Sequence, residues 1–237
     1  MLKKIRKILQ VLLIVFIGAC FVLLPWSNID RTAAEKRMVF DKQPIQYPIR
    51  QSNITMYTDG KQLVNQLFSD IRKAKHYVYI NFFSIADDKV SHQFLDLLRQ
   101  KSQEGVEVYY AVDRLGGILL KKRERELLVK EGVHFTYYNK PAFPYLFASL
   151  DRRNHRRISI IDGRIGYIGG FNIGKKYLGE KVKLGHWRDY HLQIRGEGVQ
   201  DLEHQFVLDW RKNTEQQIPI HSATKEKGAT LHRFTAY

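Results

Sequence analysis

A chain of 237 residues is long enough for one well-buried domain or two small ones, and its 44% hydrophobic and 27% charged residues exclude disorder throughout. Lys and Arg number 39 against 24 Asp and Glu, so the net charge is +15 and the surface attracts polyanions, either nucleic acid or an anionic lipid layer. The single cysteine, Cys20, excludes an internal disulfide framework and a cysteine-rich metal site.

Residues 1–26 are predicted to be a short basic tail followed by one transmembrane helix. From Ile8 to Trp26 the chain is almost entirely apolar, which is about the length needed to cross a hydrocarbon core of roughly 30 Å. Basic residues crowd the N-terminal side of this stretch, and Trp26 stands where an interfacial aromatic residue belongs. We therefore expect a single-pass protein of the cell membrane.

Two other interpretations of the N-terminus fit less well. A cleavable signal peptide has a shorter apolar core, and residues 25–27 offer no pair of small residues for cleavage. A lipoprotein signal ending at Cys20 is disfavoured because the apolar run continues past the cysteine. The basic residues ahead of the predicted span favour a cytoplasmic N-terminal tail, which would place the domain outside the cytoplasm. Basic residues also follow the span closely and weaken this preference.

Beyond the span, residues 27–52 are expected to be a polar connector, because Pro44 and Pro48 discourage regular structure. From residue 53 onward, helical and strand patterns alternate. Helical spacing of apolar residues predicts helices over 61–75, around 94–105, over 118–130 and over 199–210. Short β-branched and aromatic runs predict strands over 77–83, 106–112, 133–138, 158–161, 165–168 and 190–195. The alternation predicts an α/β sandwich with a mixed sheet over residues 53–212.

One segment combines groups that suit phosphate chemistry. His155 and Arg157 are two residues apart, so they point to the same face if a strand begins here. An Asp-Gly turn follows at residues 162–163, and then come Gly169-Gly170, where a backbone can approach a ligand closely because no Cβ intervenes. Asn172 adds an amide donor. An imidazole, a cation, bare backbone and an amide suit a phosphate with a nucleophile beside it.

These residues resemble the H-x-K-x4-D-x6-G-G-x-N motif of the phospholipase D superfamily, with Arg157 in place of the family's lysine. Further stretches resemble bacterial cardiolipin synthases, namely residues 154–156, 168–174, 177–179, 187–192 and 199–210. The resemblance covers residues 54–212 and corresponds to the N-terminal half of such a synthase. It implies a phospholipase D-like α/β/α sandwich with a mixed sheet.

The resemblance also implies an activity, a two-step phosphatidyl transfer that needs no metal and no cofactor. One motif histidine attacks the phosphodiester and forms a phosphohistidine, and a second histidine protonates the leaving alcohol and deprotonates the incoming one. In cardiolipin synthases two phosphatidylglycerol molecules become cardiolipin and glycerol. The anionic phospholipid and the membrane are then the expected partners, and nucleic acid is not.

The same resemblance assigns roles to individual residues. His155 is the nucleophile or the acid/base, and Arg157 and Asp162 complete the catalytic motif, with Asp162 expected mainly to fix the turn. Phosphate oxygens are expected to contact Arg157, Asn172 and the two glycines Gly169 and Gly170. Asp189 is the candidate carboxylate that orients the histidine, although an exposed turn carboxylate would look the same in sequence.

Only one copy of the motif occurs in these 237 residues, whereas two-motif enzymes supply both histidines from one chain. We therefore expect a homodimer that supplies the second motif, and we expect residues 213–237 to be the truncated start of a second half. Two alternatives stay open, a single-motif phosphodiesterase or nuclease and an inactive fragment. The aromatic residues 143–147 form either a membrane-facing loop or a cover over the core.

Overall fold

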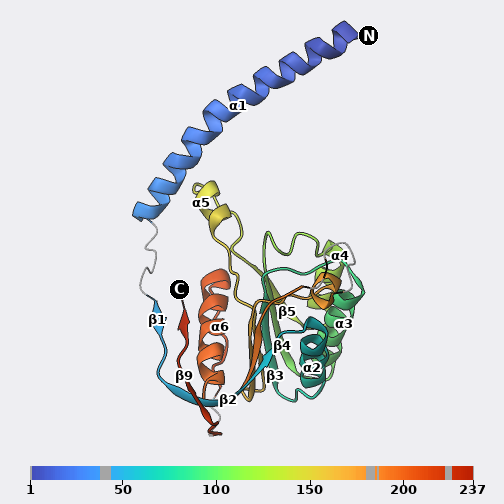
Figure 1. Ribbon diagram of the computed structural model, residues 1–237, viewed down its shortest axis with the longest axis vertical. Coiled ribbons are helices and arrows are strands. Elements are labelled where there is room, and N and C mark those ends of the chain that lie inside the picture. Colours follow the sequence, from blue (N-terminus) through green and yellow to red (C-terminus); the bar gives the residue numbers. More distant parts are fainter. Residues whose placement is uncertain (1, 38–43, 180–184, 186, 222–225, 237) are drawn as a thin grey trace. The chain divides into compact units, whose positions relative to one another are not determined.

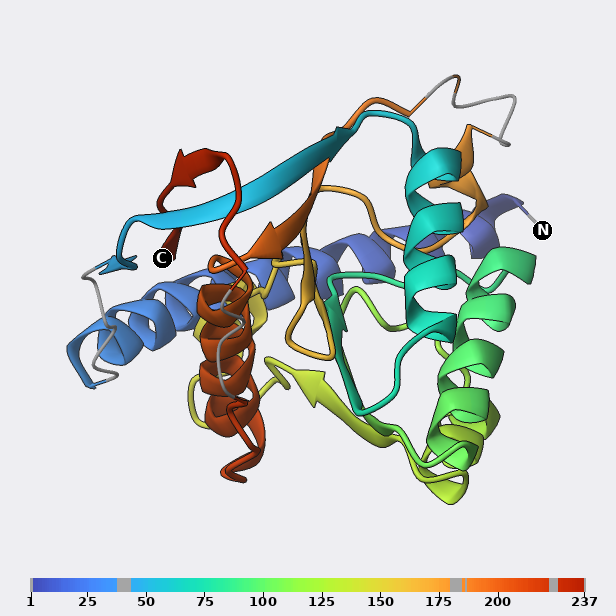
Figure 2. The ribbon, with the colours of Figure 1, turned by 90° about the horizontal axis from the view of Figure 1, so that it is seen from below.

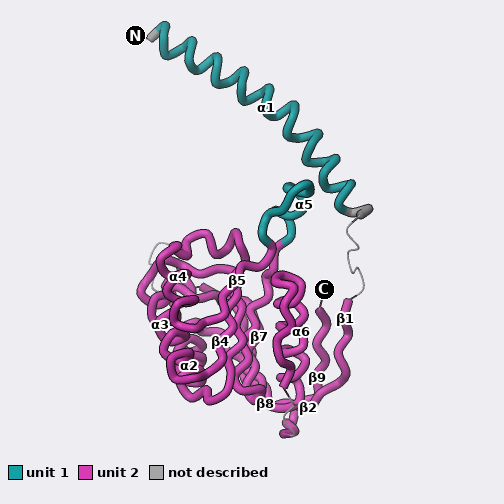
Figure 3. Tube along the Cα trace, turned by 180° about the vertical axis from the view of Figure 1, so that it is seen from behind, with its two compact units in different colours: residues 1–42, 140–152 teal, residues 43–139, 153–237 magenta. Residues whose placement is uncertain are grey.

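The computed structural model describes residues 2–37, 44–179, 185, 187–221 and 226–236. The chain divides into two units, which are described separately. Unit 1 comprises residues 1–42 and 140–152, and unit 2 comprises residues 43–139 and 153–237 (Figure 3).

Unit 1 consists of a long helix and a short one. Helix α1 (Leu2–Arg37) contains one stretch, Lys3–Ala34, that is long and apolar enough to cross a membrane. The expectation of a connector from residue 27 is wrong at this end, because α1 continues through residues 27–37, where Ala33, Ala34 and Glu35 are good helix formers. Helix α5 (Leu146–Asp151) belongs to the same unit and packs against α1.

Unit 2 is built on a mixed sheet of eight strands, in the order β5-β4-β3-β6-β7-β8-β2-β9. Strands β3, β4 and β5 are parallel, and all other pairs are antiparallel. The strands are β2 (Arg50–Tyr57), β3 (Tyr77–Phe82), β4 (Glu107–Asp113), β5 (His134–Tyr138), β6 (Ile158–Ile161), β7 (Ile165–Gly169), β8 (His191–Gly196) and β9 (Thr230–His232). A separate two-stranded ribbon joins β1 (Ile45–Gln46) to β10 (Thr235–Ala236).

Helices cover both faces of this sheet (Figures 1 and 2). One face is covered by α2 (Gly60–Arg72), α3 (Lys89–Gln103) and α4 (Lys122–Lys130), and the other by α6 (Val199–Thr214). A short 3-10 helix, η1 (Lys175–Leu178), contacts α2 and α3. Each face has its own hydrophobic core, and in one of them Phe206 of α6 stacks on both Tyr79 and Trp210. The predicted α/β/α sandwich with a mixed sheet is confirmed.

Most predicted elements are present within a few residues of their predicted bounds. The Asp-Gly hairpin is confirmed, because Asp162 and Gly163 both adopt positive φ, 50° and 62°, in the turn between β6 and β7. The third predicted helix begins at Lys122 rather than at residue 118 because the chain first turns tightly. In that turn a Cβ on Gly116 would lie 1.9 Å from the carbonyl oxygen of Phe83.

Strand β2 begins inside the segment that was expected to be a connector. Its backbone is paired on both sides, with β8 and with β9, and these long-range partners satisfy hydrogen-bonding groups that the local sequence leaves open. The C-terminal residues expected to form a tail contain strands β9 and β10, and α6 extends to Thr214.

Candidate functional site

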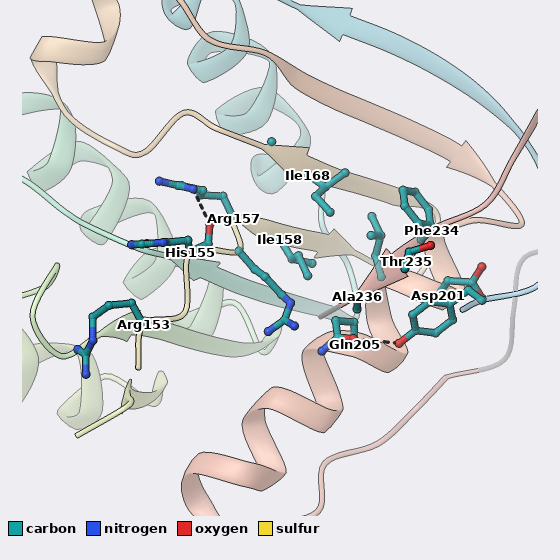
Figure 4. A pocket seen from close by; sticks show the side chains of 14 residues that line it. Arg153, His155, Arg157, Ile158, Ile168, Asp201, Gln205, Phe234, Thr235 and Ala236 are labelled. Carbon is teal, nitrogen blue, oxygen red and sulfur yellow. Dashed lines mark hydrogen bonds between the residues drawn. The ribbon is translucent and has the colours of Figure 1, made fainter. Parts of the chain in front are cut away.

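The two motif side chains His155 and Arg157 lie in the extended segment just ahead of β6. The strand begins at Ile158 rather than at His155, so the predicted alternation within a strand does not apply to them. Their side chains nevertheless extend in the same direction (Figure 4). The guanidinium of Arg157 donates to the backbone carbonyl of His155, which fixes the two residues relative to each other.

Phe83, which follows β3, supports both side chains. The His155 ring stands edge-on to the Phe83 ring, with 4.2 Å between ring centroids, and the Arg157 guanidinium lies 5.7 Å from the centre of the same ring. His155 itself is exposed. The imidazole is therefore held on one side by an aromatic ring and open to a substrate on the other.

Arg157 is half-buried and anchored by hydrogen bonds. Its Nε donates to Asn172 Oδ1 at 3.3 Å, in addition to the bond that it makes to His155. Burial lowers the pKa of Arg157, while Tyr177 and the nearby Asp189 carboxylate act in the opposite direction. An arginine nevertheless stays protonated at neutral pH, so the site contains a fixed positive charge beside the imidazole.

Asn172 is the centre of a small buried network. Its Oδ1 also accepts from the Ser84 backbone N–H at 3.0 Å, and its Nδ2 donates to the Tyr177 hydroxyl at 3.1 Å. Both ends of the amide are thus occupied by protein atoms. The prediction that Asn172 contacts phosphate oxygens stays untested, whereas its bond to Arg157 shows that it holds the cation in place.

The two glycines bring β7 close to the segment that leads into β8. The Gly170 N–H donates to the Tyr190 carbonyl at 2.8 Å, and a Cβ on Gly170 would lie only 1.8 Å from Asp189 Oδ1. The close approach predicted at these glycines is therefore made, at Gly170, by the Asp189 side chain. Gly169 lines the pocket described below.

Asp189 lies beside the motif but makes local bonds. Its Oδ1 accepts from the Tyr190 N–H at 2.8 Å, and its Oδ2 is 3.5 Å from the Trp187 indole nitrogen. Among the residues that the structure describes, no hydrogen bond joins Asp189 to His155. Its electrostatic effect on Arg157 places it at the site, and the orienting role stays a prediction.

Asp162 is the motif residue that the structure leaves apart from the others. It follows the far end of β6, so four strand residues, or about 13 Å, separate it from the Arg157 end. Its carboxylate accepts from the backbone N–H groups of residues 75, 76 and 77 at 2.8–3.0 Å. These bonds fasten the β6–β7 turn to the start of β3, which is a structural task.

A buried network that the sequence did not reveal holds the loop before His155. The Asp113 carboxylate, fully buried at the end of β4, accepts from Arg153 Nη1 at 2.7 Å and from the Asn154 backbone N–H at 3.0 Å. Asp209 of α6 accepts from Asn154 Nδ2 at 2.9 Å and pairs with Arg156 at 3.2 Å. The sequence analysis did not single out Asp113, and its place directly after the predicted strand 106–112 is the one signal that could have pointed to it.

His191 of β8 lies beneath the glycines. It is 1% exposed, its Nδ1 has no hydrogen-bond partner among the described residues, and a Cβ on Gly169 would lie 2.7 Å from its ring. Burial, with the positive charge of Arg157, lowers the pKa of His191 to about 3. His191 is therefore a neutral histidine in the floor of the site.

A pocket of about 450 Å³ opens beside the motif (Figure 4). One end presents the basic side chains of the motif segment, and the other end is walled by the first turns of α6 and by residues 234–236, which include β10. The lining residues named in Figure 4 include Arg153, His155, Arg157, Ile168, Asp201, Gln205 and Phe234. Such a mixture of cationic and apolar walls suits an amphiphilic molecule with a phosphate group. Within the described residues, no group of three or more His, Cys, Asp or Glu is placed to hold a metal ion.

Comparisons with known proteins agree with this geometry. Residues 67–210 match the family model described as the phospholipase D-like domain of cardiolipin synthase. The chain is 45% identical over 165 residues to minor cardiolipin synthase ClsB of Bacillus subtilis, an alignment that covers 70% of this chain and 42% of that protein. It is 39% identical over 163 residues to cardiolipin synthase 2 of Staphylococcus epidermidis, covering 69% of this chain and 33% of that protein. The chain thus spans less than half the length of these curated relatives.

Two solved structures share the fold. Phosphatidylserine synthase of Haemophilus influenzae matches with a TM-score of 0.56 and 16% identity, covering 84% of this chain and 44% of that one. NucT of Helicobacter pylori matches with a TM-score of 0.51 and 13% identity, covering 69% of this chain and 98% of that one. At these identities the likeness concerns the arrangement of helices and strands alone.

Proposed function

This chain belongs to the family defined by the phospholipase D-like domain of cardiolipin synthases, and we propose that it is a membrane-bound phosphatidyltransferase that converts two phosphatidylglycerol molecules into cardiolipin and glycerol. The proposal rests above all on one observation, the 45% identity to a cardiolipin synthase across 165 residues. The family model, which matches residues 67–210, includes the entire motif segment. The helix α1, long enough to cross a bilayer, supports single-pass anchoring in the cell membrane.

We assign the first chemical step to His155. Its exposed imidazole attacks the phosphorus of phosphatidylglycerol, a nitrogen–phosphorus bond forms, and the bond from phosphorus to the glycerol oxygen breaks. Arg157, held by Asn172 and by the His155 carbonyl, stabilises the negative charge on the phosphate oxygens. The departing glycerol oxygen takes a proton from a second motif histidine.

The second step reverses these roles. The hydroxyl of another phosphatidylglycerol gives its proton to that second histidine and attacks the phosphohistidine, which releases cardiolipin and frees His155. The sequence holds one motif, so we propose that the second histidine is His155 of another copy of this chain. Asp189 is the proposed orienting carboxylate, because it already lies against Gly170 and within electrostatic reach of Arg157.

The test uses the detergent-solubilised chain with labelled phosphatidylglycerol, beside His155→Ala and His134→Ala. His134 is an exposed histidine at the start of β5, stacked on Tyr109, and serves as the matched control. We expect cardiolipin and glycerol in equal amounts, a loss of at least about 10³-fold in His155→Ala, and no more than a twofold change in His134→Ala. Turnover by folded His155→Ala, or none by the folded parent chain, contradicts the proposal.

A further inference from the structure

A second candidate for membrane contact lies in unit 1, outside the catalytic motif. Residues 140–152 pack on the C-terminal part of α1 through α5. The Asp30 carboxylate, 4% exposed, accepts from the Ala148 N–H at 2.8 Å, and Arg31 pairs with Asp151 at 2.6 Å. These bonds attach α5 to α1 at residues 30 and 31 of the long helix.

Along α1, these bonds lie just beyond the end of the apolar run Ile8–Trp26. The Trp26 ring, which ends the stretch, meets the Phe147 ring edge-on at 5.2 Å. Asp30 lies four residues further, or about 6 Å along the helix axis. Because the headgroup layer on each side of a bilayer is about 5–8 Å thick, a helix bound between Trp26 and Asp30 lies at headgroup depth when α1 crosses the membrane.

The loop that leads into α5 presents an aromatic side chain to solvent. Phe143 is 76% exposed, and basic residues Lys140 and Arg152 bracket the segment. The loop is shaped from within, because the Ala142 N–H donates to Ser149 Oγ at 3.0 Å and Ser149 Oγ donates to the Leu146 carbonyl at 2.8 Å. An exposed aromatic residue in a segment that basic residues flank in sequence is typical of interfacial membrane-binding segments.

We propose that residues 143–147 form a second membrane contact, in which Phe143 inserts into the interfacial layer of the bilayer that α1 crosses. The occupant of this surface is an anionic phospholipid layer, which the flanking cations favour. Only Arg153 and Asn154 separate this unit from His155 along the chain. The inference rests on the proposed membrane anchoring and is independent of the proposed activity.

The experiment labels single cysteines with an environment-sensitive dye in nanodiscs that contain phosphatidylglycerol. In a Cys20→Ser background, Phe143→Cys is compared with Val129→Cys, a matched apolar residue that is 59% exposed on α4. We expect lipids with a shallow nitroxide to quench the label at position 143 several-fold more than the label at 129, and iodide to quench in the opposite order. Equal iodide quenching at the two positions overturns the proposal.

Asp30 variants test whether α1 sets the depth. Asp30→Ala removes the carboxylate that accepts from Ala148, so lipid quenching at position 143 should fall at least twofold, and Asp30→Asn, which keeps an acceptor oxygen, should restore it. Unchanged quenching in Asp30→Ala overturns the claim that α1 holds the loop at the interface. None of these measurements depends on turnover, so loss of the proposed function leaves their outcome intact.

Discussion

At the residue scale, the site depends on how Arg157 is held. Its Nε bonds to Asn172, and its guanidinium bonds to the His155 carbonyl. A lysine ammonium is a compact point charge on a flexible stem and does not reproduce the two directed bonds of the planar guanidinium. In this chain the arginine therefore both neutralises phosphate and fixes the backbone of the nucleophile.

This geometry predicts a graded response at position 157. Arg157→Lys keeps the charge and loses the directed bonds, so kcat/KM for phosphatidylglycerol should fall about tenfold, whereas Arg157→Ala should lose about 10²–10³-fold. Steady-state kinetics of the two variants against the parent chain check the expectation. Equal losses in both variants would mean that the charge does not contribute and that the bonds alone matter.

His191 gives a residue-scale prediction about pH. Its folded-state pKa of about 3 lies below the ordinary histidine value of 6.5, because burial disfavours the charged form. Between these two values the unfolded chain binds a proton that the folded chain does not, so stability falls as pH falls from 6.5 towards 3. The destabilisation amounts to about 2 kcal/mol at pH 5 relative to neutral pH.

Replacing His191 with glutamine removes this titration. The parent chain should lose about 2 kcal/mol more than His191→Gln between pH 7.5 and pH 5, as measured by thermal unfolding of both proteins in the same detergent. The other titrating groups are the same in both proteins, so their contributions to the pH dependence of stability cancel in the comparison. Parallel stability curves for the two proteins would show that His191 is protonated in the folded chain.

At this scale the sequence predicted which side chains form the site better than it predicted their hydrogen-bond partners. His155, Arg157 and Asn172 lie together as the motif suggested. The partners of Asn172 and Gly170, which include Ser84 and the Tyr190 carbonyl, come from other segments of the fold. Hydrogen bonds between distant segments leave no periodic signal in a sequence, so these assignments needed the structure.

At the element scale, the strands and helices with strong periodicity were predicted well, and the connections were not. Strand β6 has the predicted bounds, and α2 begins one residue before its prediction. Helix α5 and strand β2 escaped prediction because α5 is short and packs on α1, while β2 is defined by pairing with β8 and β9. Local propensity is a weak guide wherever tertiary partners decide the conformation.

The loop between α5 and β6 is one segment whose conformation depends on a tertiary partner. That partner is Asp113 at the end of β4, a buried carboxylate that accepts from Arg153 and from the Asn154 backbone. Asp113→Asn removes the buried carboxylate that pairs with the 11%-exposed Arg153 side chain, so the free energy of unfolding should fall by about 3 kcal/mol. Chemical denaturation measures this, with Glu126→Gln on the exposed face of α4 as a control that should change it by less than about 0.5 kcal/mol.

Activity gives an independent check on this positioning residue. At a temperature where Asp113→Asn is fully folded, kcat should fall about tenfold and KM should change little, because His155 is displaced while the pocket walls on α6 remain. A variant that is destabilised but turns over at the parental rate would show that Asp113 supports the fold and does not position His155.

At the scale of the whole molecule, the alternation of elements predicted an α/β sandwich with a mixed sheet, and the family resemblance implied its α/β/α layers. The order of strands in the sheet could not be predicted from the sequence. Strand β2, from the N-terminal side of the domain, lies between β8 and β9, which come from its C-terminal side. The oligomeric state is equally hard to predict from the sequence. A surface that contacts a second copy of the chain does not change the periodic pattern of apolar residues from which helices and strands are predicted.

A mixing experiment decides whether two copies share one site. If each active dimer uses His155 from both chains, co-expression with an equal amount of His155→Ala leaves one quarter of the dimers with two histidines, so activity should fall to about a quarter. Independent chains would retain about half of the activity, because each parental chain would work alone.

The measurement is total cardiolipin formation over several expression ratios, with differently tagged chains so that the amount of each can be quantified. It distinguishes a quadratic dependence of activity on the parental fraction from a linear one. The control mixes the parent chain with His134→Ala, whose histidine is remote from the motif on β5, and should show no loss at any ratio. A linear dependence for the His155→Ala mixture would refute the shared site and require each chain to find its second proton carrier elsewhere.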